Sequence, residues 1–190
     1  LDLKDKRIAV VGTGASAIQF IPEIQPQVKQ LYVFQRTPPW IIPRLDGPIS
    51  NTMKKLYRQI PLLQKANRFK IYLQREYMVL GFTNPKMMKK TQEEALAHMY
   101  KAIKDPHLRH KLTPNYTIGC KRILLSNDYY PALAKPNVDV NTNGIAQIEE
   151  HAVIDEKGNR FDVDIIIYRT GFKVTNTPLA NYIYGIDGHS

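Results

Sequence analysis

The sequence predicts an α/β fold in which a parallel sheet carries a glycine-rich turn. Between Lys6 and Thr37 a strand, a glycine-rich turn, a helix and a second strand follow one another. Residues 162–168 form another apolar run, typical of a strand buried on both faces. Between these parts, residues 50–112 have a helical pattern. Such a segment does not fit inside a parallel sheet, so we expect a helical insertion outside it.

Length and composition are those of a globular protein. The chain has 190 residues, 43% of them apolar and 23% charged, which is enough to bury a sizeable core. No apolar run approaches membrane-spanning length, and the first residues lack the layout of a signal peptide. A single cysteine excludes an intrachain disulfide. We therefore expect a cytoplasmic protein without a membrane span.

The net charge of +10 raises the alternative of a nucleic acid or an anionic membrane surface as partner. Much of the charge lies between Lys54 and Lys111, in the pattern of solvated helix faces. No aromatic and basic motif of a known DNA or RNA module accompanies it. A phosphate-rich cofactor, or an acidic surface on a missing partner domain, explains the sign with fewer assumptions, so no nucleic-acid partner is predicted.

The first strand is predicted at residues 8–11, a short apolar run. The next six residues match the form G-x-G-x-x-(G/A): Gly12, Thr13, Gly14, Ala15, Ser16 and Ala17. The first glycine permits a tight bend, and the second lets the backbone approach a pyrophosphate. The N–H groups that open the following helix would bind the phosphates. The turn is therefore a candidate dinucleotide site.

The segment after the turn predicts a helix and then a second strand. Apolar residues recur every three or four positions at Ala17, Ile21, Ile24 and Val28, and residues 31–34 form the strand. Roughly 20 residues beyond the glycines, an NAD site places an acidic residue, but here Arg36 and Thr37 follow the strand. A guanidinium pairs bidentately with phosphate, so we predict NADPH rather than NADH. For Arg36 alone, a solvated strand-end cation is the alternative.

The helical segment contains its own start and stop signals. Ser50 or Asn51 can cap a first helix, and Pro61 suits the first turn of a second. Asn84-Pro85 separates that long helix from a third. We therefore assign residues 50–112 to the insertion, and residues 1–49 and 113–190 to the nucleotide-binding domain.

Several residues of chemical interest have a simpler structural interpretation. Trp40 could cover a channel, but packing beneath a loop is favoured because large aromatic residues are usually structural. His107 and His110 have H-x-x-H spacing, yet no cysteine or second carboxylate completes a ligand set, so no metal site is predicted. No Ser-His-Asp or Cys-His arrangement stands out.

The last third of the chain predicts more strands. Lys121 and Arg122 stand just before the apolar run 123–125, where they could be a functional pair or a surface pair. Residues 138–140 predict a strand, and residues 145–161 an antiparallel meander. Residues 162–168 would return to the main sheet, closed by Thr170, Gly171 and Phe172.

Three segments in this order resemble the NADPH domain of class B flavoprotein monooxygenases, most closely the Baeyer-Villiger type: GTGASAIQFIPEIQPQVKQLYVFQRTPPW, GCKRILLSNDYYPAL and DVDIIIYRTGF. The resemblance covers essentially the whole chain and implies a Rossmann-like NADP-binding domain. It implies that a separate FAD domain is built from sequence before and after this segment. The FAD glycine motif and the family fingerprint F-x-G-x-x-x-H-x-x-x-W would lie upstream of Leu1. We therefore expect an NADPH domain cut at both ends.

The resemblance also implies roles for matching positions. The turn residues Gly12, Gly14, Ser16 and Ala17 would hold the pyrophosphate, and the group that would bind the 2′-phosphate comprises Arg36, Thr37 and Lys121. Arg122 matches an arginine thought to reach the nicotinamide and the flavin and to stabilise a peroxyflavin. Thr170-Gly171 belongs to a motif that usually reads Ala-Thr-Gly and links the two dinucleotide domains, and Arg169 replaces its alanine here.

The implied activity is oxygenation of a ketone or a heteroatom in a small-molecule substrate. NADPH would reduce FAD, and the resulting peroxyflavin would transfer oxygen. The fragment alone is expected to bind NADP(H) without turnover, with the FAD domain of the same parent chain as its partner. The alternative is a free-standing NADP-binding sensor or regulatory domain with no flavin partner.

Overall fold

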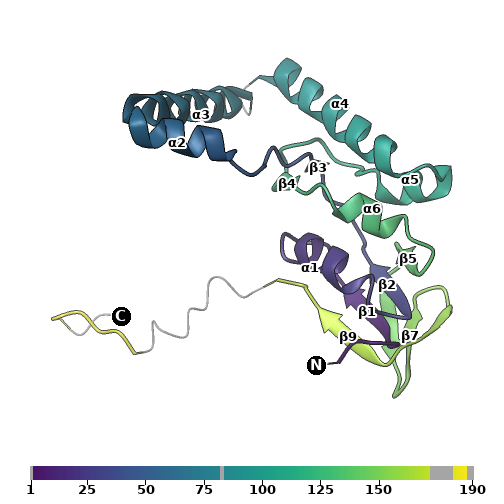
Figure 1. The fold of residues 1–190 in the computed structure, drawn as a ribbon. Coiled ribbons are helices and arrows are strands. Elements are labelled where there is room, and N and C mark those ends of the chain that lie inside the picture. The colour runs from purple at the N-terminus through teal and green to yellow at the C-terminus, as the bar shows by residue number, and fades with distance from the viewer. Residues whose placement is uncertain (1, 82–83, 172–181, 188–190) are drawn as a thin grey trace.

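A parallel four-stranded sheet forms one end of the molecule (Figure 1). The computed structural model describes residues 2–81, 84–171 and 182–187. The strand order is β5-β2-β1-β9, and the bounds are β1 (Arg7–Val11), β2 (Gln30–Phe34), β5 (Val138–Asn141) and β9 (Ile165–Tyr168). The predicted α/β fold with a parallel sheet is confirmed.

The first strand, helix and second strand form as the sequence predicts. β1 and β2 pair in parallel from Arg7 opposite Gln30 to Val11 opposite Phe34. Between them α1 (Ala17–Ile24) buries its apolar face, which comprises Ala17, Ile18, Ile21 and Ile24. Only the length of the helix differs from the prediction: α1 contains Pro22 and ends at Ile24, so Val28 lies after it, although Val28 is buried in the main core.

The other described strands form two smaller sheets. β3 (Ile41–Ile42) pairs in parallel with β4 (Leu124–Leu125). The predicted meander is present as β6 (Ile145–Ile148), β7 (Ala152–Asp155) and β8 (Arg160–Asp162). The sequence predicted a strand over residues 162–168 that returns to the main sheet, and the start of this strand was placed wrongly. Asp162 pairs with Ala152 inside the meander, and β9 begins at Ile165 after the chain has turned.

Asp164 fixes this turn to the start of β1. Its carboxylate accepts hydrogen bonds from the backbone N–H of Arg7 at 2.7 Å and from the Arg7 guanidinium at 3.0 Å. The bond from the Arg7 side chain lowers the pKa of the Asp164 carboxyl to about 2. The last strand of the sheet is therefore held at its beginning by the first residue of β1.

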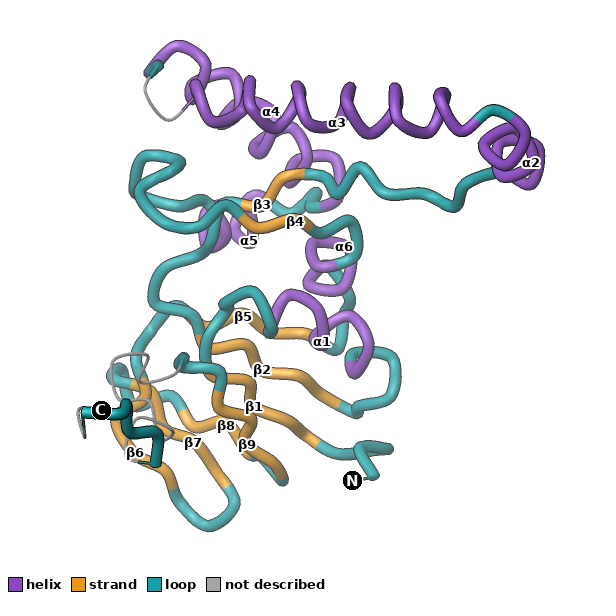
Figure 2. Tube along the Cα trace, turned by 90° about the vertical axis from the view of Figure 1, so that its left-hand side faces the viewer, coloured by secondary structure: helices purple, strands orange, loops and turns teal. Residues whose placement is uncertain are grey.

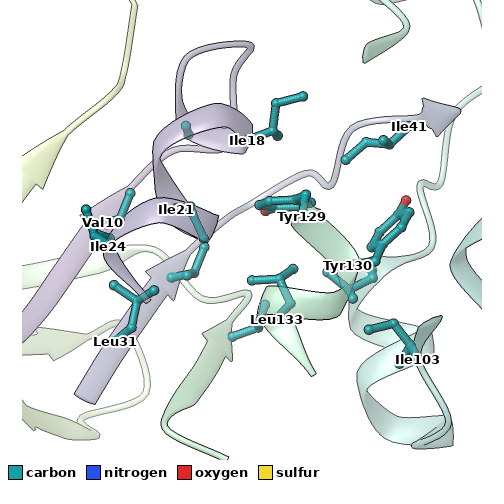
Figure 3. Close-up of a cluster of buried hydrophobic side chains, with 14 of the residues drawn as sticks. Val10, Ile18, Ile21, Ile24, Leu31, Ile41, Ile103, Tyr129, Tyr130 and Leu133 are labelled. Carbon is teal, nitrogen blue, oxygen red and sulfur yellow. The ribbon is translucent and has the colours of Figure 1, made fainter. Parts of the chain in front are cut away.

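The main core lies between the sheet, α1 and α6 (Tyr129–Leu133), as Figure 3 shows. Val10 and Leu31 face α1 from the sheet, and Tyr129 is fully buried where α6 packs on α1. Ile41 and Ile103 enter the same cluster from β3 and from the end of α4 (Pro85–Ala102). The core therefore joins all three parts of the chain.

The described residues of the predicted insertion form four helices: α2 (Asn51–Gln59), α3 (Pro61–Gly81), α4 (Pro85–Ala102) and α5 (Pro106–Leu112). The predicted starts are confirmed. The Ser50 hydroxyl accepts a hydrogen bond from the Met53 N–H, α3 begins at Pro61, and Asn84 caps α4. α5 is a separate helix that the sequence pattern did not distinguish, and it starts at its own cap, Asp105.

The two halves of the insertion differ in burial. Ala95, Met99 and Ile103 are buried, and the latter two belong to the main core. All described α3 side chains before Gly81 are exposed, and Figure 2 shows α2 and α3 far from the sheet. In the described ranges, no helix combines the length and apolar character needed to cross a bilayer. Only the α4–α5 half is thus built into the core.

Lys111, near the end of α5, ties the insertion to the sheet. Its ammonium group donates to the Val140 carbonyl oxygen at 2.8 Å. The buried Gln35 amide, just after β2, donates to the Lys111 carbonyl oxygen at 3.1 Å. These bonds hold the last turn of α5 beside the carboxyl ends of β2 and β5.

Met99→Ala should lower the free energy of unfolding by about 2–5 kcal/mol, because a fully buried side chain is lost from a packed core. Leu73→Ala, on the exposed length of α3, should change it by no more than about 0.5 kcal/mol. Urea unfolding of both variants beside the wild type measures the difference. Equal effects would contradict the assignment of α4 to the core.

Candidate functional site

The carboxyl ends of β1, β2 and β9 meet where the order of the sheet reverses. From β1 the chain continues to β2 and β5 on one side, whereas β9 returns on the other side. Ligands of open α/β sheets bind outside the strand ends at such a position. The Gly12 N–H donates to the Phe34 oxygen at 2.9 Å, and the Arg169 N–H donates to the Val11 oxygen at 2.7 Å. The three strand ends are thus fixed relative to one another.

The glycine turn follows β1 at this place. Gly12 has a φ of +102°, and a Cβ there would lie 2.5 Å from the carbonyl oxygen of Arg169. At Gly14 a Cβ would meet no atom within 4 Å, so the space beside this residue is open to a ligand. Ser16 makes no capping hydrogen bond through its side chain, and the first turn of α1 carries no acidic residue. The turn can therefore accept an anion.

Two cavities adjoin the turn. The first has a volume of about 490 Å³, and its lining includes eight of the predicted site residues: Gly12, Thr13, Gly14, Arg36, Thr37, Lys121, Thr170 and Gly171. The second has a volume of about 260 Å³ and is lined by Gly14, Ala15, Ser16, Ala17, Tyr168, Arg169 and Gly171. The structure thus brings every predicted cofactor-binding residue to this edge of the sheet. Arg122 is exposed and lines neither cavity.

The lining of the first cavity is basic. It contains three cations, Arg36, Lys121 and Arg169, and no aspartate or glutamate. A group that carries several negative charges would be attracted here, and a carboxylate that could repel it is absent from the lining. The donor set and the open glycine turn fit a dinucleotide with an additional phosphate.

Lys121 reaches the cavity from a distant part of the sequence. β4 pairs with β3, which follows β2, and this pairing returns residue 121 to the strand ends. The Lys121 ammonium lies 4.7 Å from the centre of the Tyr116 ring. Trp40 donates its indole N–H to the Tyr116 carbonyl oxygen at 2.8 Å and is buried, so the prediction that Trp40 packs beneath a loop is confirmed.

Asn143, Gly144, Ile145 and Arg169 are among the lining residues that the sequence did not predict as cofactor ligands. The first three follow β5, whose carboxyl end points to the same edge as those of β1 and β2. The order of the strands could have predicted these three residues, because a loop that follows a parallel strand begins at this edge of the sheet. For Arg169 the signal was its position directly after β9.

The loop after β5 is held by the buried carboxylate of Asp155. It accepts hydrogen bonds from the side-chain amides of Asn141, Asn143 and Asn159 at 2.8–3.0 Å, and from the backbone N–H groups of Lys157 and Asn159 at 2.9 Å. Burial raises the pKa of the Asp155 carboxyl, but the hydrogen bonds to its charged form outweigh burial and lower it. This wall of the cavity is therefore firmly held.

Metal ligands do not gather in the part of the chain that the structure describes, where no three His, Cys, Asp or Glu side chains could hold an ion. The backbone N–H of His107 is bonded to Asp105, the cap of α5. His107 and His110 thus belong to the short helix that ends the insertion.

A family model described as flavin-binding monooxygenase-like matches residues 2–186. The chain belongs to this family. The resemblance predicted from the sequence is therefore confirmed. The family to which the chain belongs is a family of enzymes.

Curated relatives of this flavin-binding monooxygenase-like chain include two Baeyer-Villiger monooxygenases. The protein from Pseudomonas aeruginosa is 52% identical over 188 residues, which are 98% of this chain and 36% of the relative. The protein from Streptomyces coelicolor is 47% identical over 190 residues, which are 100% of this chain and 37% of the relative. The chain thus spans little more than a third of their length.

Two solved structures share the fold. An oxidized steroid monooxygenase bound to NADP has a TM-score of 0.74 at 26% identity, covering 90% of this chain and 40% of that one. OTEMO in an FAD-bound form has a TM-score of 0.75 at 26% identity, covering 98% of this chain and 42% of that one.

Asp155→Asn should loosen the wall at residues 143–145, because an amide at this position presents an N–H₂ group to donors that need an acceptor. Amide hydrogen exchange of Asn143 and Gly144 should become faster, while exchange in β1 should not change. Unchanged exchange at residues 143 and 144 would show that Asp155 does not hold this loop.

The same variant predicts a pH dependence of stability. Because the native pKa of Asp155 is lowered, its contribution is complete above about pH 4, near the usual pKa of an unfolded aspartate. The contribution is lost as the pH falls further. The difference in stability between wild type and Asp155→Asn should therefore shrink on acidification below about pH 4, measured by urea unfolding. Asp46→Asn, which removes an exposed carboxylate, is the control.

Proposed function

We propose that this chain is the NADPH-binding part of an FAD-dependent monooxygenase. The observation that carries the proposal is the larger cavity, where an open glycine turn and three cations meet without a carboxylate in the lining. In this proposal residues 1–49 and 113–190 form the Rossmann-like NADP-binding domain, and residues 50–112 form the helical insertion. The structurally similar steroid monooxygenase is bound to NADP, which supports the choice of nucleotide.

Different residues of the site would bind the different phosphates of the nucleotide. Arg36, Thr37 and Lys121 would bind the 2′-phosphate, since they contribute two cations and a hydroxyl to the lining of the cavity. The turn at residues 12–17 would hold the pyrophosphate through the N–H groups that open α1. Asn143 and Gly144 would border the adenosine half, because they line the same cavity after β5.

FAD would be bound mainly by segments outside this chain and would supply the oxygen chemistry when bound. This chain would hold the reductant and orient it toward the flavin. Arg122, next to Lys121 and exposed, would face the missing domain and stabilise negative charge there, because its guanidinium stays protonated. The parent enzyme would then oxygenate a ketone or a heteroatom in a small-molecule substrate.

Nucleotide preference tests the proposal directly. Trp40 is the single tryptophan of the chain and packs on Tyr116, which Lys121 contacts, so its fluorescence can report binding. The wild type should bind NADPH more tightly than NADH. Arg36→Ala should reduce this preference at least about tenfold, since a charged hydrogen bond contributes roughly 1.5–3 kcal/mol. Lys54→Ala, on α2 away from the cavity, should leave it unchanged. Equal affinities in the wild type would contradict the proposal.

The isolated chain should bind NADPH without turning it over. Purified protein mixed with NADPH, FAD and oxygen should consume NADPH no faster than a mixture without protein, because the segments expected to hold FAD are outside the chain. Absorbance at the reduced-nicotinamide band measures this consumption. Rapid oxygenation of a ketone by the chain alone would contradict its assignment as the reductant-binding part.

A further inference from the structure

Arg169 has a fixed backbone and an unusually placed side chain. Its N–H donates to Val11, and its carbonyl oxygen occupies the space beside Gly12, so the backbone cannot shift without disturbing the glycine turn. Its guanidinium carbon lies 5.3 Å from the centre of the Phe20 ring. Phe20 lies on α1, one turn beyond Ser16, whose carbonyl oxygen accepts the Phe20 N–H. The cation is therefore held alongside the first turn of α1.

Among the described residues, the charge of Arg169 has no carboxylate within ion-pair distance. Two other arginines near the sheet do have one: Arg7 pairs with Asp164, and Arg160 pairs with Glu149. Arg169 lies beside the positive end of α1, which an unneutralised cation should avoid. Among the described residues, the Arg169 guanidinium and the positive end of α1 thus lie close together without a carboxylate that pairs with Arg169.

Arg169 is also the residue that connects the two cavities. Gly14, Arg169 and Gly171 line both cavities. Arg169 supplies the positive charge in the lining of the smaller cavity. Arg36 and Lys121 line the larger cavity, where they fit the 2′-phosphate. Arg169 therefore extends the positive charge of the larger cavity into the smaller one, beside residues 14–17 of the glycine turn.

We propose that Arg169 is a binding residue for the pyrophosphate of the dinucleotide, held in position by Phe20. This inference rests on the proposed NADPH function. A guanidinium can bind two phosphate oxygens at once while its face stays on an aromatic ring. Because NADP⁺ and NAD⁺ share the pyrophosphate, Arg169 strengthens the binding of both and does not distinguish between them. Selectivity belongs to Arg36 and Lys121.

Three probes separate these roles in the 190-residue chain: NADP⁺, NAD⁺ and adenosine 2′-phosphate, which has no pyrophosphate. Arg169→Ala should weaken NADP⁺ and NAD⁺ by the same factor, about tenfold, and leave adenosine 2′-phosphate unchanged. Arg36→Ala should weaken NADP⁺ and adenosine 2′-phosphate but not NAD⁺. Calorimetric titration measures all of these affinities, and Arg44→Ala, whose side chain pairs with Asp46 on a loop, is the control.

Two further variants test the part played by the ring. Phe20→Leu should weaken both dinucleotides about two- to fivefold, the usual size of an exposed cation–π contact. Arg169→Lys should restore part of the affinity lost in Arg169→Ala, because the charge remains but the planar fork does not. Both side chains are partly exposed, and circular dichroism should show that each variant folds.

The outcomes separate this inference from the proposed function. If the wild type binds NADP⁺ and Arg169→Ala binds it equally well, the role of Arg169 is wrong and the proposed function stands. If Arg169→Ala weakens adenosine 2′-phosphate as much as NADP⁺, Arg169 does not act on the pyrophosphate. If the folded wild type binds neither NADP⁺ nor NADPH, both proposals are wrong.

Discussion

The structure depends on the close approach of two backbone segments, Gly12 after β1 and Arg169 after β9. A carbonyl oxygen lies where a side chain at residue 12 would have to be, so residue 12 must be glycine. This approach places the turn at the middle of the strand ends, with β2 on one side and β9 on the other. The cavities form here because the strand ends diverge around a turn that carries almost no side-chain volume.

Around this centre, the site is assembled from segments far apart in the sequence, each with its own support. Lys121 depends on the pairing of β3 with β4 and on the packing of Trp40 against Tyr116. The loop at residue 143 depends on the buried carboxylate of Asp155. The insertion is tied to the sheet through Lys111. The walls of the site are thus supported by the core and by hydrogen bonds outside it.

The sequence predicted the features that depend on neighbouring residues. The glycine spacing and the apolar periods gave β1, α1 and β2, and the caps Ser50 and Asn84 marked helix starts. What it could not predict depends on contacts across the fold. Burial of Met99 and exposure of the described α3 side chains before Gly81, like the contact of Arg169 with Phe20, follow from tertiary packing that no local pattern encodes. The role of Arg122 stays a prediction, because the residue lines neither cavity.

The long separation between the paired strands has a consequence for folding. Ile8 of β1 pairs with Ile165 of β9, and the bond from Arg7 to Asp164 closes a loop of 157 residues. During translation, β1 therefore lacks its neighbour β9 until almost the whole described chain has been synthesised. Contacts this distant are slow to form, since loop-closure entropy must be overcome first. The glycine turn should reach its final conformation among the last parts of the protein, and chaperones would meet a chain whose central strand is still half uncovered.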